Sequence, residues 1–457
     1  MVNNAVDGAV QKLNLVLAVA PPQEAVMLVQ GCVISTLDYT RRTVHEVVAE
    51  EHWKRFDDAL VDGLERAMGG VGWRAFPKVE QQLFLPGSLA GFSFRQFAGT
   101  AEAAILASYS AAYKFRGSST PEPVGFNSQV KQFNNQQVRP ADRVSEGYRD
   151  LMQKLCLEKK PQKHLTRLVR LKREEQFRAG LSAEQLVQVG AMRDTGALLY
   201  LLSVDWGSVL PLYPGTESHL TPEEFKYLFR RALVALPNPH NLDPSLVTTC
   251  GRYFVSSGAR CECPLDLRLS HAESKCKGVR GQKKHDAIQT AVIVVARELG
   301  LAAGAKGDIL GSTVHGDLTI SGHQPRSLVV DVKNFNPISQ DVGKEKAAKE
   351  RKNEGHYKMV CAAAGMDFAS FITTVWGGFG KSAELVLKML VSRLVVQEDV
   401  TNSWASTTVR RRIQVSFMKQ IALNGLATMR KIPGFEEHTV VVMWNEIVFK
   451  NVLLFDR

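Results

Sequence analysis

The stretch that decides the fold of the C-terminal half is Gly316-Asp317-Leu318-Thr319-Ile320, followed by a turn and then Leu328-Val329-Val330-Asp331-Val332-Lys333. Both flanks have strand composition, and the serine, glycine and proline between them favour a turn. A hairpin centred on Gln324 places Asp317 opposite Asp331, since each lies seven residues from the centre. Because strand side chains alternate, Lys333 shares a face with Asp331. The other face, which we expect in the core, carries Leu328, Val330 and Val332.

Two opposed carboxylates in a half-buried strand pair repel each other unless a cation lies between them. Mg²⁺, which prefers oxygen ligands, is the natural candidate for Asp317 and Asp331. A neighbouring Lys333 could then orient an attacking water or neutralise charge in the transition state of phosphodiester hydrolysis. Glu298, at the end of the preceding helix, is an optional third carboxylate. The alternative is an exposed strand face that carries ordinary charges.

Four of the seven cysteines lie between Cys250 and Cys276, an uneven distribution that indicates a metal site rather than a disulfide framework. The spacing C-x-C-x7-H-x4-C selects Cys261, Cys263, His271 and Cys276. Three thiolates and an imidazole suit tetrahedral Zn²⁺, and four protein ligands leave no open position, so we expect a structural knuckle. Cys250 is an alternative ligand, but it lies farther away in the sequence and is left out of this set. Four unrelated residues, with buried reduced cysteines, are the alternative.

The pattern of apolar residues predicts an α+β fold: a helical N-terminal half, the knuckle, and a small mixed sheet flanked by helices. The predicted regions are helical 1–116, a linker 117–143, basic helical 144–248, the knuckle 249–281 and a mixed domain 282–457. Thr221 begins one helix with a capping box and a proline. Strands are predicted at 314–320, 327–334, 371–375 and 439–443. Gly377 to Ser382 ends like a phosphate loop, but Val375 replaces its first glycine, so we interpret it as a turn.

Lysine and arginine number 57 against 46 aspartates and glutamates, and the pI is near 9.3. This excess favours a polyanionic partner, either nucleic acid or an anionic surface. The basic helical stretch 144–182 is either a phosphate-contacting surface or a solvated helix face. No apolar run reaches membrane-spanning length, and Met1 to Gly8 lacks the basic start of a signal or transit peptide.

The order of these motifs resembles the restriction-like endonuclease of site-specific non-LTR retrotransposons, a relative of the PD-(D/E)XK nucleases. The resemblance lies in the knuckle, then Lys284-His285-Asp286 opening a helix, then Asp317, then Asp331-Val332-Lys333, then a helix with Lys352 and Tyr357. It is specific from about 250 to 380. Upstream, Gln30 to Thr43 and Leu85 to Ala112 resemble the thumb region of such a reverse transcriptase.

The resemblance implies a restriction-endonuclease-like fold and a metal-dependent DNA endonuclease that nicks target DNA for retrotransposon insertion. Asp317, Asp331, Lys333 and Glu298 would be catalytic, with Mg²⁺ on the two aspartates, and the residues contacting nucleic acid would be Lys284, His285, Lys349, Lys352 and Tyr357. No Ala-Asp-Asp palm motif occurs, and Asp57-Asp58 lies in helical sequence. We therefore expect a reverse-transcriptase remnant in the nucleus, with DNA, element RNA and a polymerase in trans as partners. The alternative is a non-catalytic nucleic-acid-binding remnant.

Overall fold

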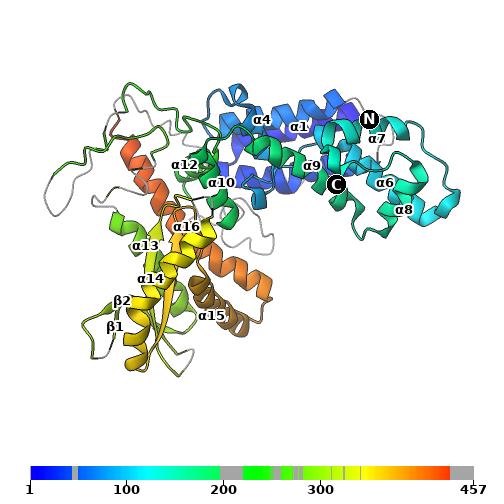
Figure 1. Cartoon of the computed structure of the whole chain (residues 1–457). Helices are drawn as coiled ribbons and strands as arrows, with labels where there is room; N and C mark the ends of the chain where they lie inside the picture. The colour runs from blue at the N-terminus through cyan, green and yellow to red at the C-terminus, as the bar shows by residue number, and fades with distance from the viewer. Residues whose placement is uncertain are drawn as a thin grey trace.

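The computed structural model describes residues 2–43, 50–195, 220–247, 249–250, 259–269, 271, 276, 281–309, 311–322, 325–339 and 341–432. Figure 1 shows an elongated helical body built from the N-terminal half and a second body that holds the sheet. Helices α12 (Pro222–Ala232) and α16 (Asn402–Met429) lie between the two bodies. The architecture is a mixed α+β fold, as the sequence predicted.

The helical body forms because apolar residues recur at helical spacing and bury one stripe of each helix. In α4, for example, Trp53, Phe56, Leu60 and Leu64 are buried, and the helix packs against α1. The helices of this body are α1 (Val2–Val19), α2 (Pro22–Leu28), α3 (Ile34–Thr43), α4 (Glu50–Ala67), α5 (Pro77–Phe84), α6 (Ala101–Arg116), α7 (Phe126–Gln132), α8 (Tyr148–Leu157), α9 (Pro161–Arg178) and α10 (Ala183–Thr195).

The predicted linker 117–143 is wrong as a description of this segment. It contains α7, and Phe126, Val130 and Phe133 are buried in a separate core with α6, α8 and α9. Three well-spaced apolar residues are enough to anchor a polar stretch, which composition alone does not reveal. The basic stretch that follows divides into α8 and α9, whose buried faces join the same core.

The sheet has the order β1 (Ala302–Asp308), β2 (His315–Ser321), β3 (Leu328–Phe335) and β4 (Asp367–Thr374). β1 and β2 are antiparallel, β2 and β3 are antiparallel, and β3 and β4 are parallel. The parallel pair requires a crossover, which α14 (Val342–Ala363) provides. β1 was not predicted, because its sequence Ala-Ala-Gly-Ala-Lys-Gly-Asp lacks branched and aromatic residues.

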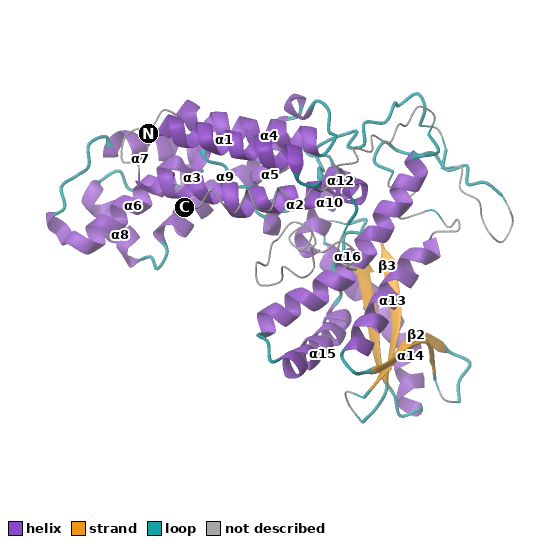
Figure 2. Ribbon diagram, turned by 180° about the vertical axis from the view of Figure 1, so that it is seen from behind, coloured by secondary structure: helices purple, strands orange, loops and turns teal. Residues whose placement is uncertain are grey.

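Helices cover both faces of the sheet. Val330 and Val332 join the large core, together with apolar residues of α13 (Gly281–Glu298) and α16. The opposite face carries Val329 and Asp331 and is covered by α14, where Cys361 packs against Val329. Figure 2 shows the strands with α13 and α14 beside them. Helix α15 (Lys381–Glu398) packs along β4.

The remaining predictions concern a helix cap, a last strand, the hairpin turn and membrane crossing. The capping box at Thr221 is confirmed: its side chain accepts from the Glu224 N–H, and the Glu224 carboxylate accepts from the Thr221 N–H. The predicted strand 439–443 and the centre of the turn at Gln324 lie outside the described residues. Among the helices that are described, none is long and apolar enough to cross a membrane.

Candidate active site and metal centre

The two aspartates predicted to face each other do so. β2 and β3 pair with Leu318 opposite Val330 and Thr319 opposite Val329, and this register, extended by one residue, sets Asp317 opposite Asp331. The two carboxyl groups lie close enough to affect each other's charge. Asp331 is buried, whereas Asp317 is about one-quarter exposed. The site is therefore a carboxylate pair at the end of the hairpin away from its turn, with one member partly exposed to solvent.

His285 is the cationic partner of Asp317. It lies in the first turn and a half of α13, and its Nε2 is 2.9 Å from the Asp317 Oδ2. The same oxygen accepts from the Val332 N–H at 2.6 Å. The hydrogen bond to Asp317 raises the pKa of His285, although burial opposes this. Burial raises the pKa of Asp317, but the bonds from His285 and Val332 outweigh it and leave that pKa below its usual value.

Lys333 is the cationic partner of Asp331, on the shared face that the alternation predicted. Its Nζ lies 3.1 Å from the Asp331 Oδ2, and half of the side chain is exposed. Asn353, on α14, contacts both groups: its Nδ2 donates to the Asp331 Oδ2 at 2.5 Å, and its Oδ1 accepts from the Lys333 Nζ. Sequence reasoning missed Asn353, because a single asparagine in a lysine-rich helix carries no pattern.

Tyr357, one turn further along α14, completes the inner wall of the site. Its ring stacks on Phe368 with centroids 5.0 Å apart. Burial, together with the negative charge of Asp331 and a hydrogen bond to it, raises the pKa of Tyr357 to about 12. The hydroxyl therefore stays protonated and supports Asp331. This placement differs from the expected contact with nucleic acid.

Glu298 does not belong to the site, which corrects the predicted third carboxylate. It ends α13, thirteen residues after His285, a separation of about 20 Å along a helix. Its carboxylate pairs with Arg412 of α16. The start of α13, rather than its end, lies beside the aspartates, as the contact of His285 with Asp317 shows. This arrangement depends on the direction in which the helix packs on the sheet.

The cationic residues expected to contact nucleic acid divide into two groups. Lys284 is buried, so it does not present its ammonium group to a ligand. Lys349 and Lys352 are exposed on α14, and the Lys349 Nζ lies 4.7 Å from the centre of the Phe335 ring. Exposed cations therefore lie on the same helix as Asn353, which contacts Asp331.

A second cluster lies in the cysteine-rich segment. The ligand atoms of Cys250, Cys261, His271 and Cys276 all lie within 4.8 Å of one another and could hold a metal ion such as zinc. The Sγ atoms of Cys250 and Cys276 are 3.6 Å apart, and the Cys261 Sγ is 3.3 Å from the His271 Nε2. A tetrahedral ion with Zn–S near 2.3 Å and Zn–N near 2.0 Å requires edges of about 3.5 to 3.8 Å. The donor set and its spacing therefore fit zinc.

Cys250 takes the place that the spacing gave to Cys263. The Cys250 N–H donates to the Cys263 carbonyl at 2.9 Å, and Thr249 forms an antiparallel bridge with Pro264. This backbone pairing brings the distant Cys250 beside the Cys-x-Cys turn and leaves Cys263 exposed. The predicted ligand Cys263 is thus corrected to Cys250, because a non-local pairing decides it.

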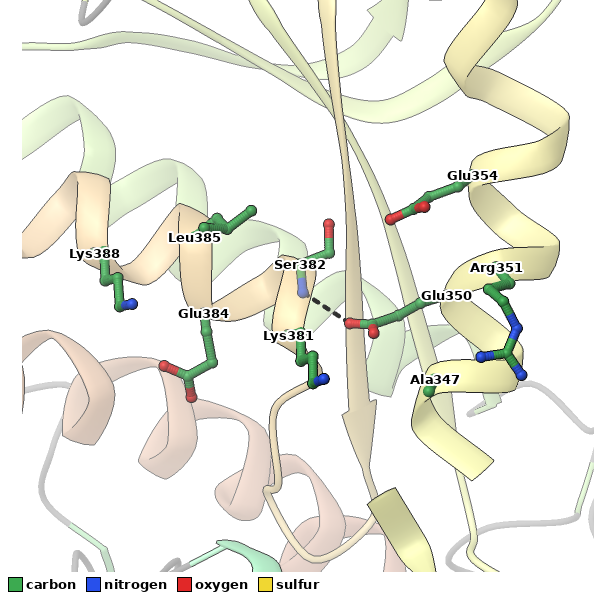
Figure 3. A pocket seen from close by; sticks show the side chains of 9 residues that line it. All are labelled: Ala347, Glu350, Arg351, Glu354, Lys381, Ser382, Glu384, Leu385 and Lys388. Carbon is green, nitrogen blue, oxygen red and sulfur yellow. Dashed lines mark hydrogen bonds between the residues drawn. The ribbon is translucent and has the colours of Figure 1, made fainter. Parts of the chain in front are cut away.

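Gly380-Lys381-Ser382 is a turn that begins a helix, as we interpreted it. The Ser382 N–H, at the first turn of α15, donates to the buried Glu350 Oε1 at 2.8 Å. Figure 3 shows this bond beside an open pocket of about 540 Å³ between α14 and α15. A carboxylate already lies where a phosphate would bind, and like charges repel.

Asp57 and Asp58 lie in α4 and have structural partners, in agreement with their helical sequence. Asp57 is buried and accepts from the Phe97 and Ala98 N–H groups at 2.9 Å, while Asp58 pairs with Arg74. They do not form a polymerase site.

The chain was also compared with known proteins. No model of a known protein family matches it, and no curated protein matches it significantly. Only the residues and their arrangement therefore bear on what the site does.

Proposed function

We propose that the chain is a metal-dependent DNA endonuclease that nicks target DNA for the insertion of a retrotransposon. The observation that carries the proposal is the convergence of Asp317, Asp331 and Lys333 at one end of a hairpin. Opposed carboxylates beside an ammonium group suit hydrolysis of a phosphodiester with help from a divalent cation.

Asp317 and Asp331 would hold Mg²⁺ through carboxylate oxygens, the ligand type this ion prefers. Their fit to a cation rests on the closeness of the two carboxyl groups on neighbouring strands, which places acidic oxygens side by side. Bound Mg²⁺ would activate water and stabilise negative charge on the phosphate oxygens.

The chain's own cations supply the rest of the site. Lys333 is half exposed, so its ammonium group can reach an attacking water or a phosphate oxygen while it stays close to Asp331. His285 holds the Asp317 carboxylate in place through a charged hydrogen bond. The exposed Lys349 and Lys352 would attract the DNA backbone, since the phosphates dominate nucleic-acid affinity.

We assign Zn²⁺ to Cys250, Cys261, His271 and Cys276, as a structural ion next to the nuclease fold. Hydrolysis that leaves a 3′-hydroxyl would provide the primer for reverse transcription. The chain has no Ala-Asp-Asp motif, so a polymerase acting in trans would extend that primer. Element RNA and nuclear residence belong to the same proposal.

Nicking of a supercoiled plasmid by the purified protein tests the activity. We expect Mg²⁺-dependent conversion to open circles that is lost in EDTA and in Asp331→Ala. Asp308→Ala is the control, because it removes a strand aspartate outside the site, whose partner is His315 at 3.0 Å. Equal nicking by the wild type and Asp331→Ala would sink the proposal.

One observation favours a second function, non-catalytic binding of nucleic acid. Each carboxylate already has a cationic partner, His285 or Lys333, so the pair can persist without a metal ion. A protein of this kind retards DNA in a salt-sensitive manner and nicks nothing. Asp317→Ala separates the two functions, since it abolishes cutting but spares binding in an endonuclease and changes little in a pure binding protein.

A further inference from the structure

Helix α14 turns a polar face toward the sheet. The residues of this buried stripe, Lys346, Glu350 and Asn353, recur at three- and four-residue spacing and are each less than one-tenth exposed. Buried polar groups are costly unless they are hydrogen-bonded. Each of these side chains therefore needs hydrogen-bond partners. Those of Asn353 lie in the candidate active site.

The orientation of the Asn353 amide is fixed by its partners. The Nδ2 donates to the carboxylate of Asp331 at 2.5 Å, and the Oδ1 accepts from the ammonium of Lys333. A carboxylate only accepts hydrogen bonds and an ammonium only donates them. In the reversed orientation, the amide nitrogen would face the ammonium group and the amide oxygen would face the carboxylate. Only one orientation therefore satisfies both Asp331 and Lys333.

A third partner anchors the amide. Its Nδ2 also donates to the Ser370 Oγ at 2.8 Å, and Ser370 lies directly beside Asp331 in the ladder of β3 and β4. The Ser370 N–H in turn donates to the Ser382 Oγ at 2.9 Å, and the Ser382 N–H donates to Glu350. This chain of bonds ties Asn353 to the start of α15, and Figure 3 shows its last bond, from the Ser382 N–H to Glu350.

Lys333 needs such support. Its side chain is long, flexible and 52% exposed, and an exposed ion pair alone contributes little to holding a lysine in one geometry. We propose that Asn353 is a positioning residue, which sets the Asp331 carboxylate and the Lys333 ammonium in one arrangement. The proposal rests on the proposed nuclease function and adds a residue to its site.

The test compares Asn353→Ala with Glu354→Gln, a control in which the neighbouring side chain lines the outer pocket instead. Ser370→Ala removes the hydrogen bond between Ser370 and Asn353 with little change in side-chain volume. This variant provides the test if Asn353→Ala does not fold. Three readouts are needed: the single-turnover nicking rate, DNA affinity by gel shift, and Mn²⁺ affinity from the electron paramagnetic resonance of the free ion.

We expect Asn353→Ala to slow nicking and to weaken Mn²⁺ binding by about 10- to 100-fold each, the usual effect of losing a partner that orients a metal ligand. DNA affinity should stay within about twofold, because Asn353 is buried. Ser370→Ala should act in the same direction and less strongly, and Glu354→Gln should behave as the wild type.

The outcomes separate the two proposals. If the wild type nicks and Asn353→Ala matches it in rate and Mn²⁺ affinity, Asn353 has no positioning role and the nuclease function stands. If the wild type binds Mn²⁺ without nicking, the nuclease function fails, and the Mn²⁺ affinities alone decide the role of Asn353. If the wild type neither nicks nor binds Mn²⁺, both proposals fail.

Discussion

The imidazole of His285 lies 2.9 Å from the carboxylate of Asp317, and this contact joins the start of α13 to strand β2. It shows that the start of α13 faces the candidate site. It also gives the folded state a pH dependence whose direction can be stated.

The His285–Asp317 pair should stabilise the fold most at mildly acidic pH. The pKa of His285 is higher in the folded state than in the unfolded state, where it is about 6.5. Its contribution to the free energy of unfolding is therefore complete below pH 6.5 and is lost as the pH rises through the folded-state pKa. The pKa of Asp317 is lowered, so its contribution is lost only as the pH falls through that lower value.

Denaturation midpoints of the wild type and His285→Gln, measured in EDTA from pH 4 to 9, test this dependence. The difference should be largest near pH 5 to 6 and should shrink above the folded pKa of His285. His315→Gln is the control, since its pair with Asp308 is well exposed. A difference that grows with pH would contradict the assigned pair.

Cys250, rather than Cys263, should be required for metal. Cys250→Ser should lower bound zinc, measured by mass spectrometry of the purified protein, well below a wild-type content of about one per chain, because the site loses one of its four protein ligands. Cys263→Ser should keep its zinc, because Cys263 contributes a backbone carbonyl to the cluster. The opposite pattern would restore the ligand set inferred from spacing.

Removal of the Asp57 charge should change how stability depends on pH. Burial raises the pKa of Asp57 to about 7, against the hydrogen bonds from Phe97 and Ala98 that lower it. The folded state thus binds the proton more tightly than the unfolded chain, and stability falls as the pH rises from about 4 to 7. A shift of this size corresponds to about 4 kcal/mol.

Asp57→Asn tests this dependence through denaturant midpoints at pH 4.5 and 7.5. The stability of the variant should not decline between pH 4.5 and pH 7.5. Its amide nitrogen will face the Ala98 N–H, so its stability will be lower than that of the wild type at both pH values. Asp58→Asn, on the exposed side of α4, is the control. The prediction fails if the wild type is equally stable at both pH values.

Replacement of two glycines by alanine should change the stability of the fold in opposite directions. A Cβ on Gly380 would lie 2.2 Å from the Glu350 Oε1, so the carboxylate must move away from the Ser382 N–H. Loss of this helix cap costs about 1 to 2 kcal/mol. A Cβ on Gly355, on the outer face of α14, meets nothing within 4 Å, so alanine should stabilise that helix by about 0.5 to 1 kcal/mol.

Thermal midpoints of Gly380→Ala and Gly355→Ala measure the two effects in the same background. Glu350→Ala should reproduce the loss seen in Gly380→Ala, and combining the two should add little, since both remove one interaction. A stable Gly380→Ala variant would show that Glu350 does not cap α15.

Local patterns in the sequence were sufficient for much of the fold. Strand composition around a turn placed Asp317 opposite Asp331 and Lys333 on the same face, because a hairpin and its alternation are properties of neighbouring residues. Apolar spacing located the helices, and Thr221 with Glu224 set the start of α12. Three of the four members of the metal cluster followed from their spacing alone.

Tertiary structure decided what depends on residues far apart in the chain. Cys250 replaces Cys263 through a backbone pairing across more than ten residues, His285 rather than Glu298 reaches Asp317 through the packing direction of α13, and Asn353 meets Asp331 only because α14 covers the sheet. Sequence spacing encodes local periodicity, whereas these contacts are selected by the burial of whole elements against one another, a property of the folded chain as a whole.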